Sequence, residues 1–256
     1  MDKICTVLLI SYNHAPYIEK CIESVLSQKT KYPYIIKIFD DCSTDGTQEI
    51  IREYANKYPD LIEVHISETN LGAQTNIWRA YKSVDTKYCI YTETDDYWCD
   101  DNKLEIQITA LEEHPNCSFC SHNTVQINQG DKVRKNFIGR IQVTNKVLNR
   151  RNSEVNLKQI KAYPFGYMPH INSRVIRTSA FNLDKIKHKE AFLYDNCQFY
   201  YLLTKGNMYY IPKVMSAYVL TGNGIFSGNE DVYRRIRKHM EAFFELEDEI
   251  ISSEKE

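Results

Sequence analysis

The chain has 256 residues and 43% of them are hydrophobic, so it is long enough to bury a sizeable core. Its formal net charge of -2 gives no overall attraction to a phosphate backbone, and we expect no nucleic-acid partner. No apolar run approaches the roughly 18 residues of a membrane-spanning helix, and the N-terminus lacks the pattern of a secretory signal peptide. We therefore expect a cytoplasmic protein.

Continuous apolar runs alternate with helical patterns through residues 1–112. The apolar runs predict strands that are covered on both faces, at residues 6–10, 34–39, 61–66 and 88–91. Apolar residues at helical spacing predict helices at residues 16–28, 50–58, 77–84 and 104–111. Repeated strand–helix units predict an α/β fold, in which a Rossmann-like, mostly parallel central sheet is flanked by helices. We expect a single domain over residues 1–256.

A polar loop follows each of the four predicted strands. These loops are Ser11–His14, Asp40–Gly46, Ser67–Gln74 and Glu93–Trp98. In open sheets of this kind, ligands bind beyond the carboxyl ends of the strands. We therefore expect the four loops to surround one site.

The fourth loop is crowded with negative charge, because Glu93, Asp95 and Asp96 lie within four residues. Carboxylates this close repel one another, and a divalent cation would relieve the repulsion, since Mg2+ and Mn2+ prefer carboxylate oxygens. The alternative is a solvated acidic turn in which Asp95 or Asp96 only caps the next helix.

Four segments, in their order and spacing, carry a resemblance to a known family. Val7–Asn13, Phe39–Thr47, Asn70–Gly72 and Glu93–Trp98 resemble the corresponding motifs of family 2 glycosyltransferases. The resemblance implies the GT-A fold and an inverting enzyme of the bacterial surface-polysaccharide type. Such an enzyme moves a sugar from a nucleoside diphosphate, here expected to be UDP, to a hydroxyl of a glycan or of a lipid-linked acceptor.

The resemblance also implies which residues bind the donor. Ser11 and Tyr12 fall beside the nucleotide base, where the tyrosine stacks, and Asp40 falls on the aspartate that hydrogen-bonds the base. Asp95 and Asp96 fall on the region that binds the ribose, the diphosphate and a divalent metal, Mn2+ or Mg2+. The alternative for Tyr12 is ordinary packing at a strand end.

The roles of four positions on the donor side stay undecided. Asn76 lines the nucleotide pocket or only decorates its helix, and Glu93 stands where many family members have aspartate, so its place in the site is undecided. In the family, an arginine and a histidine that can bind the metal precede the glycines of a late loop. Val219 and Thr221 occupy those places here. A second hypothesis is therefore a catalytically inactive nucleotide- or sugar-binding module of the same fold.

Residues 113–228 are expected to form the acceptor-binding half, which begins with a strand at residues 118–128. His170 lines the acceptor pocket in the functional interpretation and is a structural histidine in the alternative. Asp195 opens a helix and matches the family's catalytic base, which removes the proton of the attacking hydroxyl. The alternatives are that Asp195 is a simple helix N-cap, or that Asp184, which lies further from the matched segment, is the base.

Two basic segments suggest contact with a membrane-bound acceptor. Residues 130–160 are polar and basic, and we expect them to form a variable insertion on the acceptor side. A helix expected at residues 231–250, within the C-terminal segment 229–256, has a basic first half and a broad apolar face. Such a helix binds the membrane surface, here the inner face of the cytoplasmic membrane, or packs against the core.

Overall fold

One ten-stranded sheet organises the chain. The computed structural model describes residues 2–128, 133–136, 151–161, 169–184, 186, 193–221 and 241. Along the main path of the sheet the strands follow the order β3-β2-β1-β4-β9-β6-β10-β5, while β7 pairs with β6 and β8 pairs with β10. Apart from residue 241, the expected helix at residues 231–250 lies outside the described residues, and so do the glycine loop after residue 221 and most of the basic insertion.

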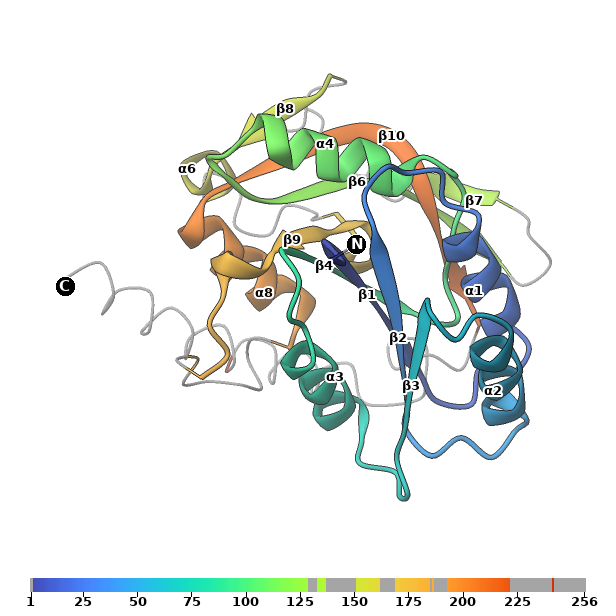
Figure 1. Cartoon of the computed structure of the whole chain (residues 1–256). Coiled ribbons are helices and arrows are strands. Elements are labelled where there is room, and N and C mark those ends of the chain that lie inside the picture. Colours follow the sequence, from blue (N-terminus) through green and yellow to red (C-terminus); the bar gives the residue numbers. More distant parts are fainter. Residues whose placement is uncertain are drawn as a thin grey trace.

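The first half of the chain forms the parallel part of the sheet, as predicted (Figure 1). Its strands are β1 (Cys5–Ser11), β2 (Tyr34–Asp40), β3 (Ile62–Ile66) and β4 (Tyr88–Glu93). The connecting helices are α1 (Ile18–Leu26), α2 (Thr47–Lys57) and α3 (Ala73–Lys82). Strands β2 and β4 both pair with β1, on opposite sides. The strand order therefore reverses between β1 and β4, which is where open sheets bind ligands.

The second half adds strands of mixed direction. They are β5 (Tyr97–Trp98), β6 (Cys117–Asn128), β7 (Val133–Asn136), β8 (Ser153–Val155), β9 (Val175–Arg177) and β10 (Asn207–Leu220). The helices are α4 (Lys103–Glu113), α6 (Leu157–Lys161) and α8 (Asp195–Lys205), with 3-10 turns at Ile171–Ser173 and Thr178–Ala180. The short strands β5 and β9 were not predicted, because two or three residues carry no period.

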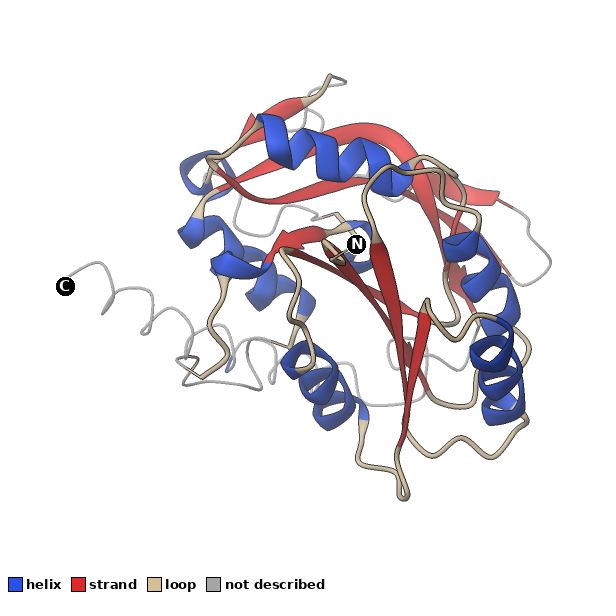
Figure 2. Ribbon diagram, viewed as in Figure 1, coloured by secondary structure: helices blue, strands red, loops and turns tan. Residues whose placement is uncertain are grey.

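Helices cover both faces of the sheet, and each face has its own core (Figure 2). Val7 and Leu9 of β1 belong to the core cluster that includes buried residues of α1, α2 and α4. Leu8 and Ile10 belong to the cluster that includes residues of α3 and α8. Side chains alternate along a strand, so one apolar run supplies both cores. Among the described residues, no helix is both long enough and apolar enough to cross a membrane.

One cation is buried in the first of these cores. Lys103, the first residue of α4, is 0% exposed, and its Nζ has no hydrogen-bond partner in the described part of the chain. The ammonium lies 4.2 Å from the centre of the Trp98 ring, which is a cation–π contact. Burial lowers the pKa of Lys103 to about 7.

We predict that Lys103→Met stabilises the protein at neutral pH. In the unfolded chain a lysine titrates near pH ~10.4, so the native state binds fewer protons than the unfolded state between about pH 7 and 10. The stability of the wild type should therefore rise with pH across that range. Lys103→Met should abolish this rise and increase the free energy of unfolding at pH 7 by about 1–4 kcal/mol.

The measurement is urea unfolding at pH 7 and pH 9.5, with the exposed Lys82→Met as the matched control. A destabilised Lys103→Met variant, or one that keeps the pH dependence of the wild type, would contradict the prediction.

Candidate active site

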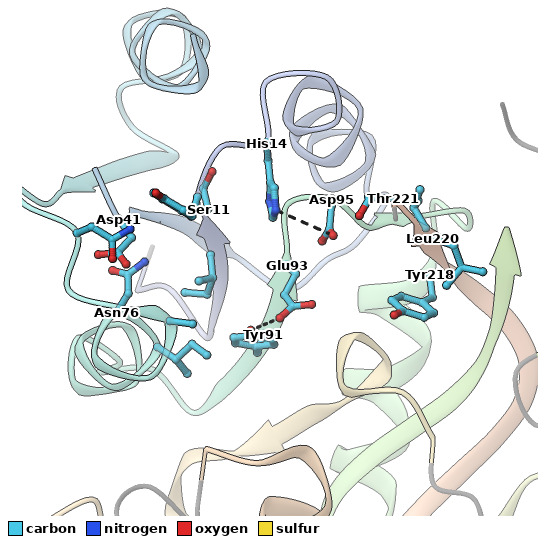
Figure 3. Close-up of a pocket in the computed structure, with 16 residues that line it drawn as sticks. Ser11, His14, Asp41, Asn76, Tyr91, Glu93, Asp95, Tyr218, Leu220 and Thr221 are labelled. Carbon is cyan, nitrogen blue, oxygen red and sulfur yellow. Dashed lines mark hydrogen bonds and ion pairs between the residues drawn. The ribbon is translucent and has the colours of Figure 1, made fainter. Parts of the chain in front are cut away.

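A cavity of about 400 Å³ opens at the carboxyl ends of β1, β2 and β4 (Figure 3). Its volume lies within the range of small-molecule sites. It is lined by residues from all four polar loops, from the strands and helix beside them and from the end of β10: Ile10, Ser11, Tyr12, His14, Asp41, Asn70, Ala73, Asn76, Ile77, Tyr91, Glu93, Asp95, Tyr218, Val219, Leu220 and Thr221. The position agrees with the reversal of strand order between β1 and β4.

The loop after β1 forms one wall. Tyr12 is 47% exposed, so its ring is available to a ligand. Ser11 is buried, and its Oγ has no hydrogen-bond partner among the described residues. The backbone N–H of His14 donates to Thr47 Oγ1 at 2.9 Å, which fixes this loop to the start of α2. Both predicted donor residues of this loop, Ser11 and Tyr12, therefore line the cavity.

The two aspartates after β2 have different surroundings. Asp40 is 0% exposed and does not line the cavity. Its carboxylate accepts hydrogen bonds from the backbone N–H of Ser43 at 2.9 Å and from the Ser43 hydroxyl, so it closes the turn. Asp41 lines the cavity, and its Oδ1 accepts a hydrogen bond from the backbone N–H of Leu71 at 2.8 Å. The structure therefore brings Asp41, and not the predicted Asp40, to the cavity wall.

Asn76 of α3 lines the cavity although it is fully buried. Its Nδ2 donates to the carbonyl of Phe39 at 3.0 Å, and its Oδ1 accepts from Arg79 at 3.4 Å. Both ends of the amide are engaged within the protein. The side chain thus anchors α3 to β2 and shapes the cavity from behind.

Asp95 and Glu93 are the two acidic residues at the end of β4 and in the loop after it that line the cavity. Asp95 is 9% exposed, and its Oδ1 is buried without a hydrogen-bond partner among the described residues. Glu93 accepts a hydrogen bond from the Tyr91 hydroxyl at 3.0 Å. Burial, followed by the charges of Asp95 and Asp195, raises the pKa of Glu93 to about 8. A cation placed here would meet an oxygen of Asp95 that has no partner among the described residues, and its charge would favour the ionised form of Glu93.

Asp96 is buried and does not line the cavity. Its Oδ1 accepts a hydrogen bond from the backbone N–H of Val219 at 2.9 Å, and its Oδ2 accepts one from Asn172 Nδ2 at 2.8 Å. Burial and the charges of Asp95 and Glu93 raise the pKa of Asp96, and the two hydrogen bonds oppose this rise. Asp96 therefore joins the acidic loop to β10 and to the 3-10 turn at Ile171–Ser173.

The acceptor-side residues meet the cavity at Tyr218. The ring of His170 lies 4.5 Å from the ring of Tyr218, and its Nδ1 lies 3.8 Å from Asp96 Oδ2. Burial is the main cause that lowers the pKa of His170. His170 does not line the cavity itself, but it supports Tyr218, which faces Glu93 from β10 (Figure 3).

Asp195, the predicted catalytic base, begins α8 and is not among the residues that line the cavity. Its backbone carbonyl accepts a hydrogen bond from the buried Arg174 at 3.0 Å. The charge of Asp195 contributes to the raised pKa values of Glu93 and Tyr218, so its carboxylate lies within electrostatic range of the cavity. No side-chain hydrogen bond caps the helix at its N-cap residue, Tyr194.

The carboxylates differ in their fitness to hold a divalent cation. Asp95 offers a buried oxygen without a partner among the described residues, whereas both oxygens of Asp96 are taken by protein donors. Mg2+ is usually held by one or two protein carboxylates together with substrate phosphates. Within the described ranges, no group of three or more His, Cys, Asp or Glu side chains is arranged to hold a metal alone. These carboxylates fit a divalent cation that binds together with a diphosphate and is held by Asp95.

Among the cavity side chains that sequence reasoning did not single out are His14, Asp41, Tyr91 and Tyr218. His14 and Asp41 stand inside the loops that were expected to form the site, so their positions after β1 and β2 carried a signal. Tyr91 ends the apolar run of β4, and Tyr218 reaches the cavity only because β10 returns beside β6. The four positions that the sequence left open, Asn76, Glu93, Val219 and Thr221, all line the cavity.

The chain is similar in sequence to known proteins. Residues 6–177, more than half of the chain, match the family model described as Glycosyl transferase family 2. The chain is 37% identical over 116 residues to TuaG of Bacillus subtilis (strain 168), whose name assigns it to teichuronic acid biosynthesis as a glycosyltransferase. This match covers 45% of the chain and 44% of TuaG. The chain spans less than half the length of the curated relatives it matches.

Two solved structures share the fold. The crystal structure of Staphylococcus aureus TarS 1-349 in complex with UDP-GlcNAc superposes with a TM-score of 0.66 at 19% identity, over 96% of this chain and 65% of TarS. The mannosyltransferase PcManGT from Pyrobaculum calidifontis, in complex with GDP-Man and Mn2+, gives a TM-score of 0.59 at 18% identity, over 86% and 58%. These likenesses confirm the predicted GT-A fold.

We predict that Asp96 and Asp95 differ in their effect on stability. Asp96→Ala leaves the buried donors of Val219 and Asn172 without an acceptor, and should lower the free energy of unfolding by about 2–4 kcal/mol. Asp95→Ala removes a carboxylate that has an unpartnered oxygen and that repels Glu93 and Asp96, and should not lower the free energy of unfolding. Urea unfolding of both variants with a metal chelator present measures the difference. An Asp95→Ala variant as unstable as Asp96→Ala would contradict it.

Proposed function

The chain belongs to glycosyltransferase family 2, and from that premise we propose that it transfers a sugar from a nucleoside diphosphate to a hydroxyl of its acceptor with inversion. The single observation that carries the proposal is the division of the cavity into two ends. Asp41 and Asn76 lie at one end, and Glu93 and Asp95 lie nearer Tyr218 at the other (Figure 3), while the exposed Tyr12 also lines the cavity. An exposed ring suits stacking on a base, and a carboxylate suits acceptance from a base N–H.

The donor then spans the ends of β1, β2 and β4. The nucleoside lies between Tyr12 and Asp41, with Asn76 behind it, and Ser11 offers its unpartnered Oγ to the donor. The diphosphate lies toward Asp95. We take UDP as the nucleotide, because TarS, which shares the fold, was crystallised with UDP-GlcNAc. GDP and dTDP are the alternatives to be tested.

A divalent cation, Mn2+ or Mg2+, would be held by Asp95 together with the donor diphosphate. When bound, it neutralises the negative charge that grows on the diphosphate as the glycosidic bond breaks. Asp96 contributes to this arrangement indirectly, since its hydrogen bonds to Val219 and Asn172 hold the acidic loop against β10.

Asp195 is the proposed base. Its carboxylate takes the proton of the acceptor hydroxyl, whose oxygen forms a bond to the anomeric carbon. The bond from that carbon to the diphosphate oxygen breaks on the opposite face, and the nucleoside diphosphate leaves. Arg174 holds the backbone of Asp195 in place, and the charge of Asp195 already acts on Glu93 in the cavity.

The acceptor is proposed to be a glycan or a lipid-linked glycan in polysaccharide synthesis. The relative TuaG, named for teichuronic acid biosynthesis, supports this class of acceptor. His170 stands behind Tyr218 on the acceptor side of the cavity. The expected basic helix at residues 231–250 would give peripheral contact with the inner face of the membrane, where a lipid-linked acceptor is available.

We predict that UDP binding depends on metal through Asp95. Calorimetry should detect UDP binding in the presence of Mn2+, and Asp95→Asn should weaken it at least about tenfold, because the remaining amide oxygen carries no charge to bind the cation. The exposed Asp101→Asn is the matched control. UDP binding that is equal in Mn2+ and in chelator would contradict the metal role. Binding of GDP or dTDP in place of UDP would reassign the nucleotide.

We predict that Asp195→Asn lowers kcat by about 10²- to 10⁴-fold with little change in the KM for the donor, because a general base acts only in the chemical step. UDP release from UDP-GlcNAc and other UDP-sugars, with a panel of acceptor glycans, measures this loss. Asp184→Asn tests the second candidate base, and we expect it to keep the activity of the wild type, since Asp184 is exposed. Donor binding by a wild type that releases no UDP with any acceptor would favour the inactive binding module.

A further inference from the structure

We propose that His14 is the second protein ligand of the donor's divalent cation, beside Asp95. The proposal rests on the proposed function, because the cation is the one that accompanies the nucleoside diphosphate. His14 and Asp95 point toward one another at the mouth of the cavity (Figure 3), and both line it. They come from loops after different strands, β1 and β4, so the pair exists only in the folded chain.

The separation of the two side chains suits a shared ion. His14 Nε2 lies 4.0 Å from Asp95 Oδ2, which is too long for a hydrogen bond. Ligand atoms lie about 2.0–2.1 Å from ions such as Mg2+ and Zn2+, so two ligands of one ion lie up to about 4.2 Å apart. A cation between Nε2 and Oδ2 therefore needs little movement of either side chain.

The hydrogen bonds of the His14 ring leave its Nε2 available to bind a metal. His14 Nδ1 lies 2.8 Å from Thr94 Oγ1, and the Thr94 hydroxyl donates its single proton to the carbonyl of Ile10 at 3.2 Å. In this arrangement Nδ1 donates to Thr94, and the neutral ring presents the lone pair of Nε2. A metal-binding histidine usually donates its other N–H in this way to an oxygen that fixes the ring.

A second observation points to a ligand at the same place. Asp95 Oδ1 and Ser11 Oγ are buried and have no hydrogen-bond partner among the described residues, although polar atoms in such places are nearly always paired. Both belong to residues that line the cavity with His14. A hydrated cation and its diphosphate would supply the missing partners.

The assignment explains how this chain can keep a metal without the loop histidine of its relatives. Val219 and Thr221 occupy the positions of that loop, and the Val219 N–H is bonded to Asp96. His14 reaches the ion from the β1 side. An imidazole ligand favours transition metals such as Mn2+ over Mg2+, which prefers oxygen ligands. Loss of His14 should therefore weaken Mn2+-supported UDP binding more than Mg2+-supported binding.

The test is pulsed electron paramagnetic resonance of the whole chain with UDP and Mn2+. UDP itself has no imidazole, so the wild type should show the 14N coupling of one coordinated imidazole. Labelling the wild type with 15N-histidine should convert the signal to that of 15N without any mutation. His14→Asn should lose it and weaken Mn2+ affinity at saturating UDP by about 10- to 100-fold. His114→Asn, at the far end of α4, should keep both.

Failure of the inference is distinct from failure of the proposed function. A wild type that binds UDP and Mn2+ with no imidazole coupling would overturn the role of His14 and leave the donor site intact. A His14→Asn variant that kept the Mn2+ affinity of the wild type would overturn that role as well. A wild type that binds no nucleoside diphosphate with any metal would overturn both the inference and the proposed function. Because the His14 backbone donates to Thr47, the variant keeps its loop anchor, and circular dichroism checks its fold.

Discussion

The carboxylate of Asp96 is the contact on which the arrangement of the site depends. It is buried beside two other acidic residues, which raises its pKa, and it is held there by the N–H groups of Val219 and Asn172. Asn172 continues the network, because its Oδ1 accepts a hydrogen bond from Ser216 at 2.9 Å. One side chain thus joins the parallel half of the sheet to the mixed half. Together with the pairing of β5 with β10, it holds the end of β10 over the cavity.

The adjacent residue, Asp95, is left for the ligand. The two aspartates follow one another, so their side chains leave the backbone in different directions, one inward to Asn172 and one toward His14. This explains how a site can carry so much negative charge: part of it is satisfied by the protein and part waits for a cation. The reversal of strand order between β1 and β4 places the charge where two loops diverge and leave room for a donor.

The sequence predicted the parallel half well and the site in part. The runs of β1 to β4 and the helical spacing of α1 to α4 are long and periodic, so their elements were found within a few residues. The loops of the site followed from the strand ends. Asp41 lines the cavity in place of the predicted Asp40 because of a local turn that Ser43 closes, with Cys42 at a φ of 64°. No pattern in the sequence signals this turn. The role of Asp96 depends on Asn172 and Val219, which are distant in sequence and meet it only through β9 and β10.

The most direct test of the metal site is a crystal structure of the chain with UDP and Mn2+, in which the anomalous signal of manganese locates the ion. We expect the ion within bonding distance of an Asp95 oxygen and of the diphosphate, with Asp96 still bonded to Asn172 and to the backbone of Val219. An ion bound to Asp96, with either of those hydrogen bonds broken, would contradict the division of roles between the two aspartates.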